Sequence, residues 1–309
     1  MPRCFLHPVF RGLPLLLLIL PLAVGEAGGA EPPTVRAKFP GIEFGILGSA
    51  RAVPMDEGTL LTGDGFKISH SDLEAAVRSQ DPQLRPHLER NLLFFLDQIA
   101  ARRVLLAEAK KSGVPSSGGD GNRLIGELLE RKSANVSVSE EEARAFYRAN
   151  RDLVSGAPYE QAKDHIRQYL LQGKKNQLIV SYVSSLGNSA RLRVNDGWLE
   201  RHGRIALDNP VDKARASGKP TMVEFGATGC IPCDRMQPIL EKLRKDYPGR
   251  LNVVFVHMRN EPFLTARYGI RSIPVQAFFD QAGKEVFRHE GFFPEPEVLG
   301  QLDKMGVSR

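Results

Sequence analysis

The chain has 309 residues, of which 42% are hydrophobic and 25% charged, with a formal net charge of +6. This length suffices for two domains with separate cores, and the composition excludes a disordered chain and one with many membrane spans. Basic residues lie among acidic ones along the predicted helices and form no run of five or six like charges with interleaved aromatics, so we predict no nucleic-acid site.

The first thirty residues have the pattern of a secretory signal peptide. Arg3 and Arg11 precede the apolar run Leu13–Gly25, and small residues follow up to Ala30. We predict cleavage near Ala30 and a periplasmic or secreted protein. An uncleaved membrane anchor is the alternative, although the run is shorter than the ~20 residues that a span needs. Membrane contact would arise only through this segment.

Three cysteines occur in the chain, and cleavage would remove Cys4. The remaining two, Cys230 and Cys233, are three positions apart. A disulfide between them closes too small a loop to remove much entropy from the unfolded chain, so chemistry explains the pair better than stability does.

Residues 31–55 are rich in Pro, Gly and Ala, and we predict an extended segment with a strand around Glu43–Val53. Ser71 and Glu74 fit a capping box that starts a short helix ending near Gln80. Apolar residues then recur at helical spacing over Leu84–Lys111, which predicts one long helix.

Three more helices are predicted, over Leu124–Glu130, Ala143–Asn150 and Tyr159–Leu186, the second preceded by a capping box at Ser139 and Glu142. Residues 56–195 therefore form a mostly α-helical domain. Its apolar stripes suit either a core of its own or a surface for client chains, because an amphipathic pattern does not distinguish the two.

Several segments of this domain resemble the N-terminal helical domain of extracytoplasmic chaperones of the SurA and PrsA type. They are LLTGDG from Leu60, SHSDLEAAV from Ser69, EAKKSGV from Glu108, VSEEEARAFYRAN from Val138 and YEQAKDHIRQYLLQ from Tyr159. The resemblance implies client binding, with a scaffold or dimerisation module as the alternative. The chain has no room for the parvulin domain of those chaperones, so prolyl isomerase activity is not expected.

Residues 196–203, which include the only Trp, Trp198, are predicted to link this domain to a second one. From Pro220 the pattern alternates between strand and helix. Strands are predicted over Thr221–Phe225, Leu251–His257, Val275–Asp280 and Glu285–His289, and helices over Ile231–Tyr247, Glu261–Tyr268 and Glu295–Met305.

The sequence Cys-Ile-Pro-Cys at 230–233 lies where the first of these strands meets its helix. A helix N-terminus favours thiolate over thiol, so Cys230 is the predicted nucleophile and Cys233 the resolving thiol. Half of a zinc site is the alternative, but zinc needs two more ligands. No second CxxC exists, and the one CxxH, at Cys4 and His7, lies in the predicted signal peptide. We predict no metal and no cofactor.

Residues 204–309 resemble the thioredoxin family. The residues that carry the resemblance are Val223–Phe225, the CIPC motif, Pro238, Tyr268–Pro274 leading into Val275–Phe279, and Gly291. The resemblance implies an α/β thioredoxin fold, with a central mixed sheet flanked by helices, and dithiol–disulfide oxidoreductase activity.

The resemblance also implies a client-binding surface. Pro274 is expected to be cis and to face the CxxC motif, which would expose the backbone of Ile273 for pairing with a client chain. Gly229 and Gly291 are the other predicted substrate-binding residues. Gly229 stands where the family often has Trp, which leaves the client preference open.

Glu224 occupies the position of the buried Asp that assists proton transfer in the family. A buried carboxyl below the disulfide has a raised pKa and can accept a proton from Cys233. The alternative is a partly solvated glutamate on the strand.

The predicted function is an extracytoplasmic disulfide reductase that acts on protein clients and is kept reduced by a membrane thiol reductant. Pro232 before the second cysteine and Ile273 before the proline are typical of reductants, whereas strong oxidants tend to have His in place of Pro232. A disulfide oxidase or isomerase and a chaperone-like binding protein are the alternatives.

Overall fold

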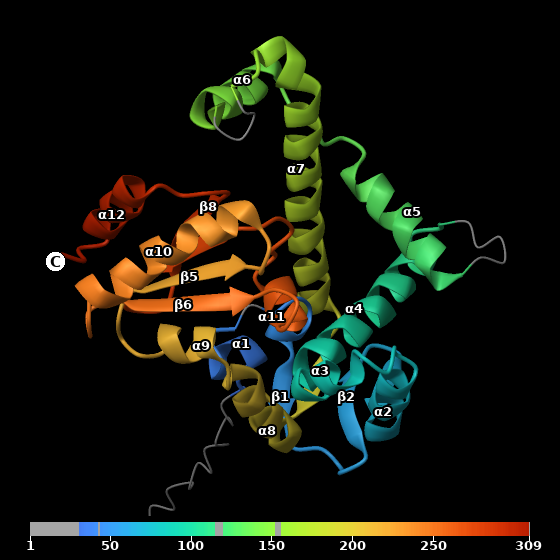
Figure 1. Cartoon of the computed structure of the whole chain (residues 1–309). Coiled ribbons are helices and arrows are strands. Elements are labelled where there is room, and N and C mark those ends of the chain that lie inside the picture. The colour runs from blue at the N-terminus through green and yellow to red at the C-terminus, as the bar shows by residue number, and fades with distance from the viewer. Residues whose placement is uncertain (1–30, 43, 115–119, 152–155, 309) are drawn as a thin grey trace, which may run out of the picture. The chain divides into compact units, whose positions relative to one another are not determined.

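The computed structural model describes residues 31–42, 44–114, 120–151 and 156–308, so the predicted signal peptide and Cys4 lie outside the described residues. Residues 32–207, here the N-terminal part, contain most of the helices (Figure 1). These elements are α1 (Val35–Lys38), the 3₁₀ helix η1 (Leu47–Ser49), α2 (His70–Arg78), α3 (Arg85–Arg90), α4 (Leu92–Lys111), α5 (Gly121–Ser133), α6 (Glu140–Ala149), α7 (Tyr159–Ser189) and α8 (Asp196–Leu207), with strands β1 (Arg51–Val53), β2 (Thr59–Gly63), β3 (Phe66–Ser69) and β4 (Arg193–Asn195).

The four short strands form a sheet in the order β1-β4-β2-β3, in which β1 and β4 are parallel. The predicted extended segment is therefore only partly extended. The strand expected over Glu43–Val53 is confined to Arg51–Val53, Glu43 lies outside the described residues, and α1 and η1 precede the strand. This segment bears fully buried side chains, including Val35, Ile46 and Leu47, so it forms part of the core.

The capping box of α2 is formed by Ser69 and Asp72, so the prediction of Ser71 and Glu74 is wrong. Ser69 caps α2 by accepting from the backbone N–H of Asp72, and Asp72 accepts from Ser69 in return. The segment holds two overlapping S-x-x-[D/E] patterns. The earlier one is used because Ser69 ends β3, where it pairs with Thr59, and the helix begins at once.

The long helix predicted over Leu84–Lys111 is two helices, α3 and α4, that meet at Asn91. The Asn91 side chain donates to the carbonyl of His87 at 2.8 Å, and its φ of −123° is outside the helical region. A local bond from Asn to the backbone competes with helix continuation, which explains the break.

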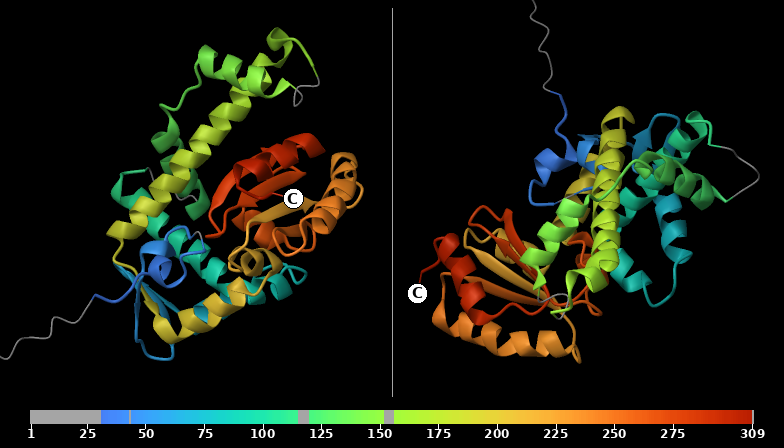
Figure 2. Two further views of the ribbon diagram at one scale, coloured as in Figure 1. Left: turned by 90° about the vertical axis from the view of Figure 1, so that its left-hand side faces the viewer. Right: turned by 90° about the horizontal axis from the view of Figure 1, so that it is seen from above.

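The second capping box is confirmed, because Ser139 and Glu142 cap α6 reciprocally. Beyond it, α7 is the longest described helix, and it packs at one end on α6 and at the other on α4 and α5 (Figures 1 and 2). The segment predicted to be a linker is helical: α8 is capped by Asn195, and Trp198 and Leu199 are buried in the same core as Val35.

Residues 208–309, here the C-terminal part, have the predicted mixed sheet flanked by helices (Figure 1). Its elements are α9 (Pro210–Arg215), β5 (Thr221–Gly226), α10 (Ile231–Asp246), β6 (Asn252–His257), α11 (Pro262–Arg267), β7 (Val275–Phe279), β8 (Glu285–Glu290) and α12 (Glu295–Lys304). Only α9 was not predicted.

The sheet order is β6-β5-β7-β8, with β6 parallel to β5 and the other pairs antiparallel. Alternate residues of each strand point to opposite faces. Met222 and Phe278 pack with α10 and α12 on one face. Val223 and Phe279 pack with residues of α9 and α11 on the other face. The central strand β5 is therefore buried throughout.

Candidate active site

Cys230 and Cys233 lie where β5 gives way to α10 and are joined by a disulfide, with their Cα atoms 5.2 Å apart. Cys230 is the N-cap residue of α10, and its Sγ accepts a hydrogen bond from the backbone N–H of Cys233 at 3.3 Å. A sulfur placed among the N–H groups of a helix N-terminus is stabilised as a thiolate. Cys230 is partly exposed, whereas Cys233 is 1% exposed.

Glycines shape the backbone on both sides of the disulfide. Gly229 has a φ of +79° although no atom would obstruct a Cβ there, so its conformation rather than space favours glycine. At Gly226, a Cβ would lie 2.9 Å from the ring of Phe255 and 3.4 Å from the Cβ of Cys233. Glycine at position 226 therefore leaves room for the ring of Phe255, and Cys233 lies next to this position.

Ile273, Pro274 and Gly291 gather at the same edge of the sheet as the disulfide. The Ile273–Pro274 peptide bond is cis, as predicted. Phe225 at the end of β5 pairs with Val275 at the start of β7, so the segment after β5 and the one before β7 share an edge. The backbone N–H of Gly291 donates to the carbonyl of Pro274 at 2.8 Å, which joins these two residues.

Glu224 is completely buried, which rules out the partly solvated alternative. Burial raises the pKa of Glu224 to about 8, against the opposing effect of a hydrogen bond from Gln276. Because side chains two residues apart on a strand share a face, Glu224 lies on the face that Gly226 presents to Cys233. The carboxyl is thus on the buried side of the disulfide.

The sequence patterns did not indicate two residues at this site, Gln276 and His257. Gln276 lies opposite Glu224 on β7 and donates from Nε2 to its Oε2 at 2.8 Å. His257 ends β6, and its Nε2 lies 3.2 Å from the backbone N of Thr228 and 3.3 Å from Thr228 Oγ1. The contacts of Gln276 with Glu224 and of His257 with Thr228 both depend on the register of the strands. The periodicity of the sequence alone does not give this register.

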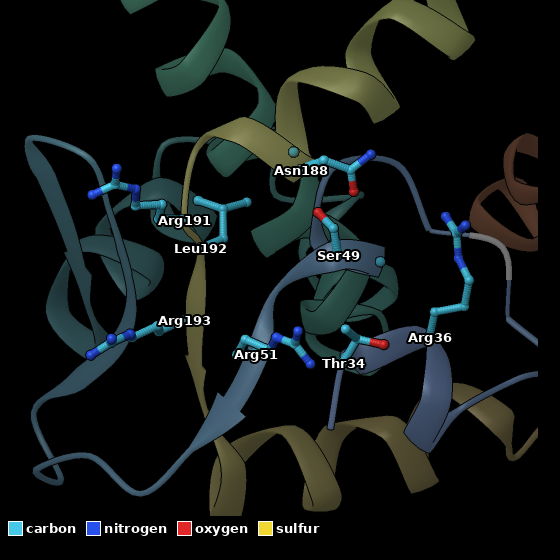
Figure 3. A pocket seen from close by; sticks show the side chains of 10 residues that line it. Thr34, Arg36, Ser49, Arg51, Asn188, Arg191, Leu192 and Arg193 are labelled. Carbon is cyan, nitrogen blue, oxygen red and sulfur yellow. The ribbon is translucent and has the colours of Figure 1, made fainter. Parts of the chain in front are cut away.

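A cavity of about 510 Å³ lies in the N-terminal part and contains neither cysteine (Figure 3). Four arginines line it: Arg36, Arg51, Arg191 and Arg193. Figure 3 shows their side chains extending in different directions rather than converging on one point. None of its lining residues belongs to the site around the disulfide.

Within the described ranges, no cluster of three or more His, Cys, Asp or Glu side chains could hold a metal ion. No helix in that same portion of the chain combines the length and apolarity needed to cross a membrane.

The fold and the disulfide at its strand-to-helix junction define the C-terminal part as a thioredoxin-like domain. Residues 207–306 match the family described as "Thioredoxin-like domain". The chain is 35% identical to thioredoxin of Staphylococcus aureus, over 27% of this chain and 79% of that protein. It is 33% identical to thioredoxin of Pyropia yezoensis, over 28% and 78%. The chain belongs to the thioredoxin family.

A third relative is the "Thioredoxin-like protein HCF164, chloroplastic" of Oryza sativa subsp. japonica. It is 30% identical over 41% of this chain, and the chain spans 45% of that protein's length.

Proposed function

We propose that this protein is an extracytoplasmic thiol–disulfide oxidoreductase that reduces disulfides in protein clients through Cys230 and Cys233. The observation that supports the proposal is the difference in exposure between Cys230 and Cys233. Cys230 is accessible at a helix N-terminus, whereas Cys233 is buried beside the sheet face that carries Glu224. A nucleophile must reach the client, whereas a resolving thiol must reach only the nucleophile.

The reaction has two displacements. The thiolate of Cys230 attacks a client disulfide, whose S–S bond breaks as one client sulfur leaves as a thiolate. Cys233 then gives its proton to the carboxylate form of Glu224 and attacks Cys230 Sγ, which releases the second client thiolate. The client gains two electrons, and the protein is left with the Cys230–Cys233 disulfide.

The residues between the cysteines support the proposed direction of electron flow. Pro232 precedes the second cysteine, and no histidine lies between the two to stabilise the reduced form further. We expect a potential of roughly −200 to −270 mV, nearer to thioredoxin than to a strong oxidant at about −120 mV. A membrane thiol reductant would then have to return the protein to its dithiol form.

The N-terminal part is proposed to hold clients in the manner of the SurA and PrsA type chaperones that it resembles. Its helix α7 exposes large apolar side chains, among them Tyr169, Leu178 and Val180, which are 53%, 40% and 67% exposed. Apolar side chains in water suit the capture of unfolded chains. A scaffold remains the alternative role for this part, and a binding-only protein the alternative for the whole chain.

Three measurements test the proposal. The dithiol form of the full chain should reduce insulin disulfides, and replacement of both cysteines by Ser should abolish the reaction. Equilibration with glutathione mixtures gives the potential, and a value above about −150 mV would favour the oxidase or isomerase alternative. Mass spectrometry of the exported protein tests its location, because cleavage should leave an N-terminus near Glu31.

A further inference from the structure

Glu224 and Gln276 form an isolated polar pair inside the C-terminal part. They face each other across β5 and β7, and both are 0% exposed. On its other side Glu224 is paired in register with Phe255 of β6, whose side chain offers no hydrogen-bond donor. The Nε2 of Gln276, at 2.8 Å from Oε2, is the one hydrogen-bond donor to this carboxyl among the described residues.

The pair leaves two oxygen atoms without partners. Glu224 Oε1 and Gln276 Oε1 are both buried and accept no hydrogen bond from the described residues. The amide therefore occupies one carboxyl oxygen and leaves the other available. An amide carries both a donor and an acceptor, so the same side chain suits the charged and the neutral form of its neighbour.

We propose that Gln276 is a positioning residue for proton transfer: by binding Oε2 of Glu224, it holds the carboxyl with Oε1 available to exchange a proton with Cys233. This inference rests on the proposed function and deepens it. In the second displacement the S–H bond of Cys233 breaks, its proton passes to Oε1, and the electron pair stays on sulfur for the attack on Cys230. When a reductant later opens the disulfide, the same proton returns to Cys233.

The neighbours of Glu224 indicate that Gln276 is the residue that positions its carboxyl. No charged side chain contributes to the raised pKa of Glu224, which results from burial, and the Gln276 bond is the one influence that lowers it. The titratable groups on the elements packed against the pair include Cys230 and Cys233 at the start of α10, His257 at the end of β6, and His289, which pairs with Gln276 from β8. Without the amide, a carboxylate at Glu224 would have no hydrogen-bond donor among the residues that the structure describes.

The test compares Gln276→Leu with the unaltered full chain. Leu keeps the approximate volume and removes both polar atoms. At each pH, the rate of insulin reduction by the variant is divided by the rate of the unaltered protein. This ratio should be about one tenth at pH 7 and should approach one above pH 9. A tenfold loss corresponds to a shift of one pH unit in the titration of Glu224. Gln301→Leu, the same change at a buried position on α12, should leave the ratio near one at every pH.

Two further variants separate positioning from folding. Glu224→Gln should remove the titration, and the double variant with Gln276→Leu should match Glu224→Gln alone. Carbon-13 NMR of Glu224 in the oxidised protein should show a titration midpoint at least one pH unit higher in Gln276→Leu. Unchanged profiles and midpoints would overturn the inference. Failure of the unaltered protein to reduce insulin would instead refute the proposed function, while the NMR titration would still test the pair.

Discussion

At the scale of single residues, the two cysteines differ in exposure, and this difference predicts different intermediates. In Cys233→Ser, Cys230 can still attack a client, but nothing resolves the mixed disulfide, so covalent complexes should accumulate. Cys230→Ser should trap far fewer, because Cys233 is 1% exposed. Non-reducing gels of exported protein show the complexes, and equal trapping by both variants would reverse the assigned roles.

The buried carboxyl of Glu224 predicts a pH dependence of stability. Its pKa is about 8 in the folded protein and near 4.5 in the unfolded chain, so between these values the folded state holds one proton more. The free energy of unfolding should therefore fall as pH rises through this window, by up to ~1.4 kcal/mol per pH unit, and level off above pH 8.

Glu224→Gln isolates this effect, because its side chain does not titrate. Denaturation midpoints of the oxidised protein and of Glu224→Gln, measured at pH 5, 6, 7 and 8, should differ increasingly in favour of the variant as pH rises. A constant difference across the range would mean that the carboxyl is already ionised in the folded protein.

At the scale of elements, the C-terminal part was predictable because β5, β6 and β7 are short, mostly apolar runs, and a turn or a helix follows each strand. The N-terminal sheet was not, because its strands have only three to five residues and β1 pairs with β4, far along the chain. Such short strands carry no clear period, and their pairing is set by tertiary contacts. For the same reason, the pairing of Glu224 with Gln276 could not be read from the sequence.

Asp97 on α4 joins this helix to the segment before β1 through two hydrogen bonds. The carboxylate of Asp97 accepts from the backbone N–H of Gly45 at 2.9 Å and of Leu47 at 2.7 Å. Asp97→Ala leaves both N–H groups without this acceptor and should lower the stability of the N-terminal part by about 1–3 kcal/mol. Thermal denaturation measures the loss. Gln98→Ala, at the next and exposed position of the helix, is the control, and equal melting of the two variants would refute the role of Asp97.

At the scale of the whole molecule, the N-terminal core defines which fragment can fold alone. It includes Val35, Ile46 and Leu47 before residue 56, and Trp198 and Leu199 after residue 195. A fragment of residues 56–195, which the helical pattern alone would suggest, lacks all five. We predict that residues 32–207 fold cooperatively and that residues 56–195 do not.

Circular dichroism melts of the two fragments check this prediction, and a sharp transition in the shorter one would contradict it. If the N-terminal part holds clients, the longer fragment should also slow the aggregation of an unfolded test protein. No effect at several-fold molar excess would leave the scaffold role alone.

The parallel pairing of β1 with β4 also affects when the N-terminal part can fold during synthesis of the chain. Arg51 cannot find its neighbour Arg193 until most of the chain has been synthesised, and the core further requires α8. Domains generally fold once their last contacting segment is available. We therefore expect the core of the N-terminal part to be completed late in synthesis, a delay that is compatible with export of an unfolded chain to the proposed location.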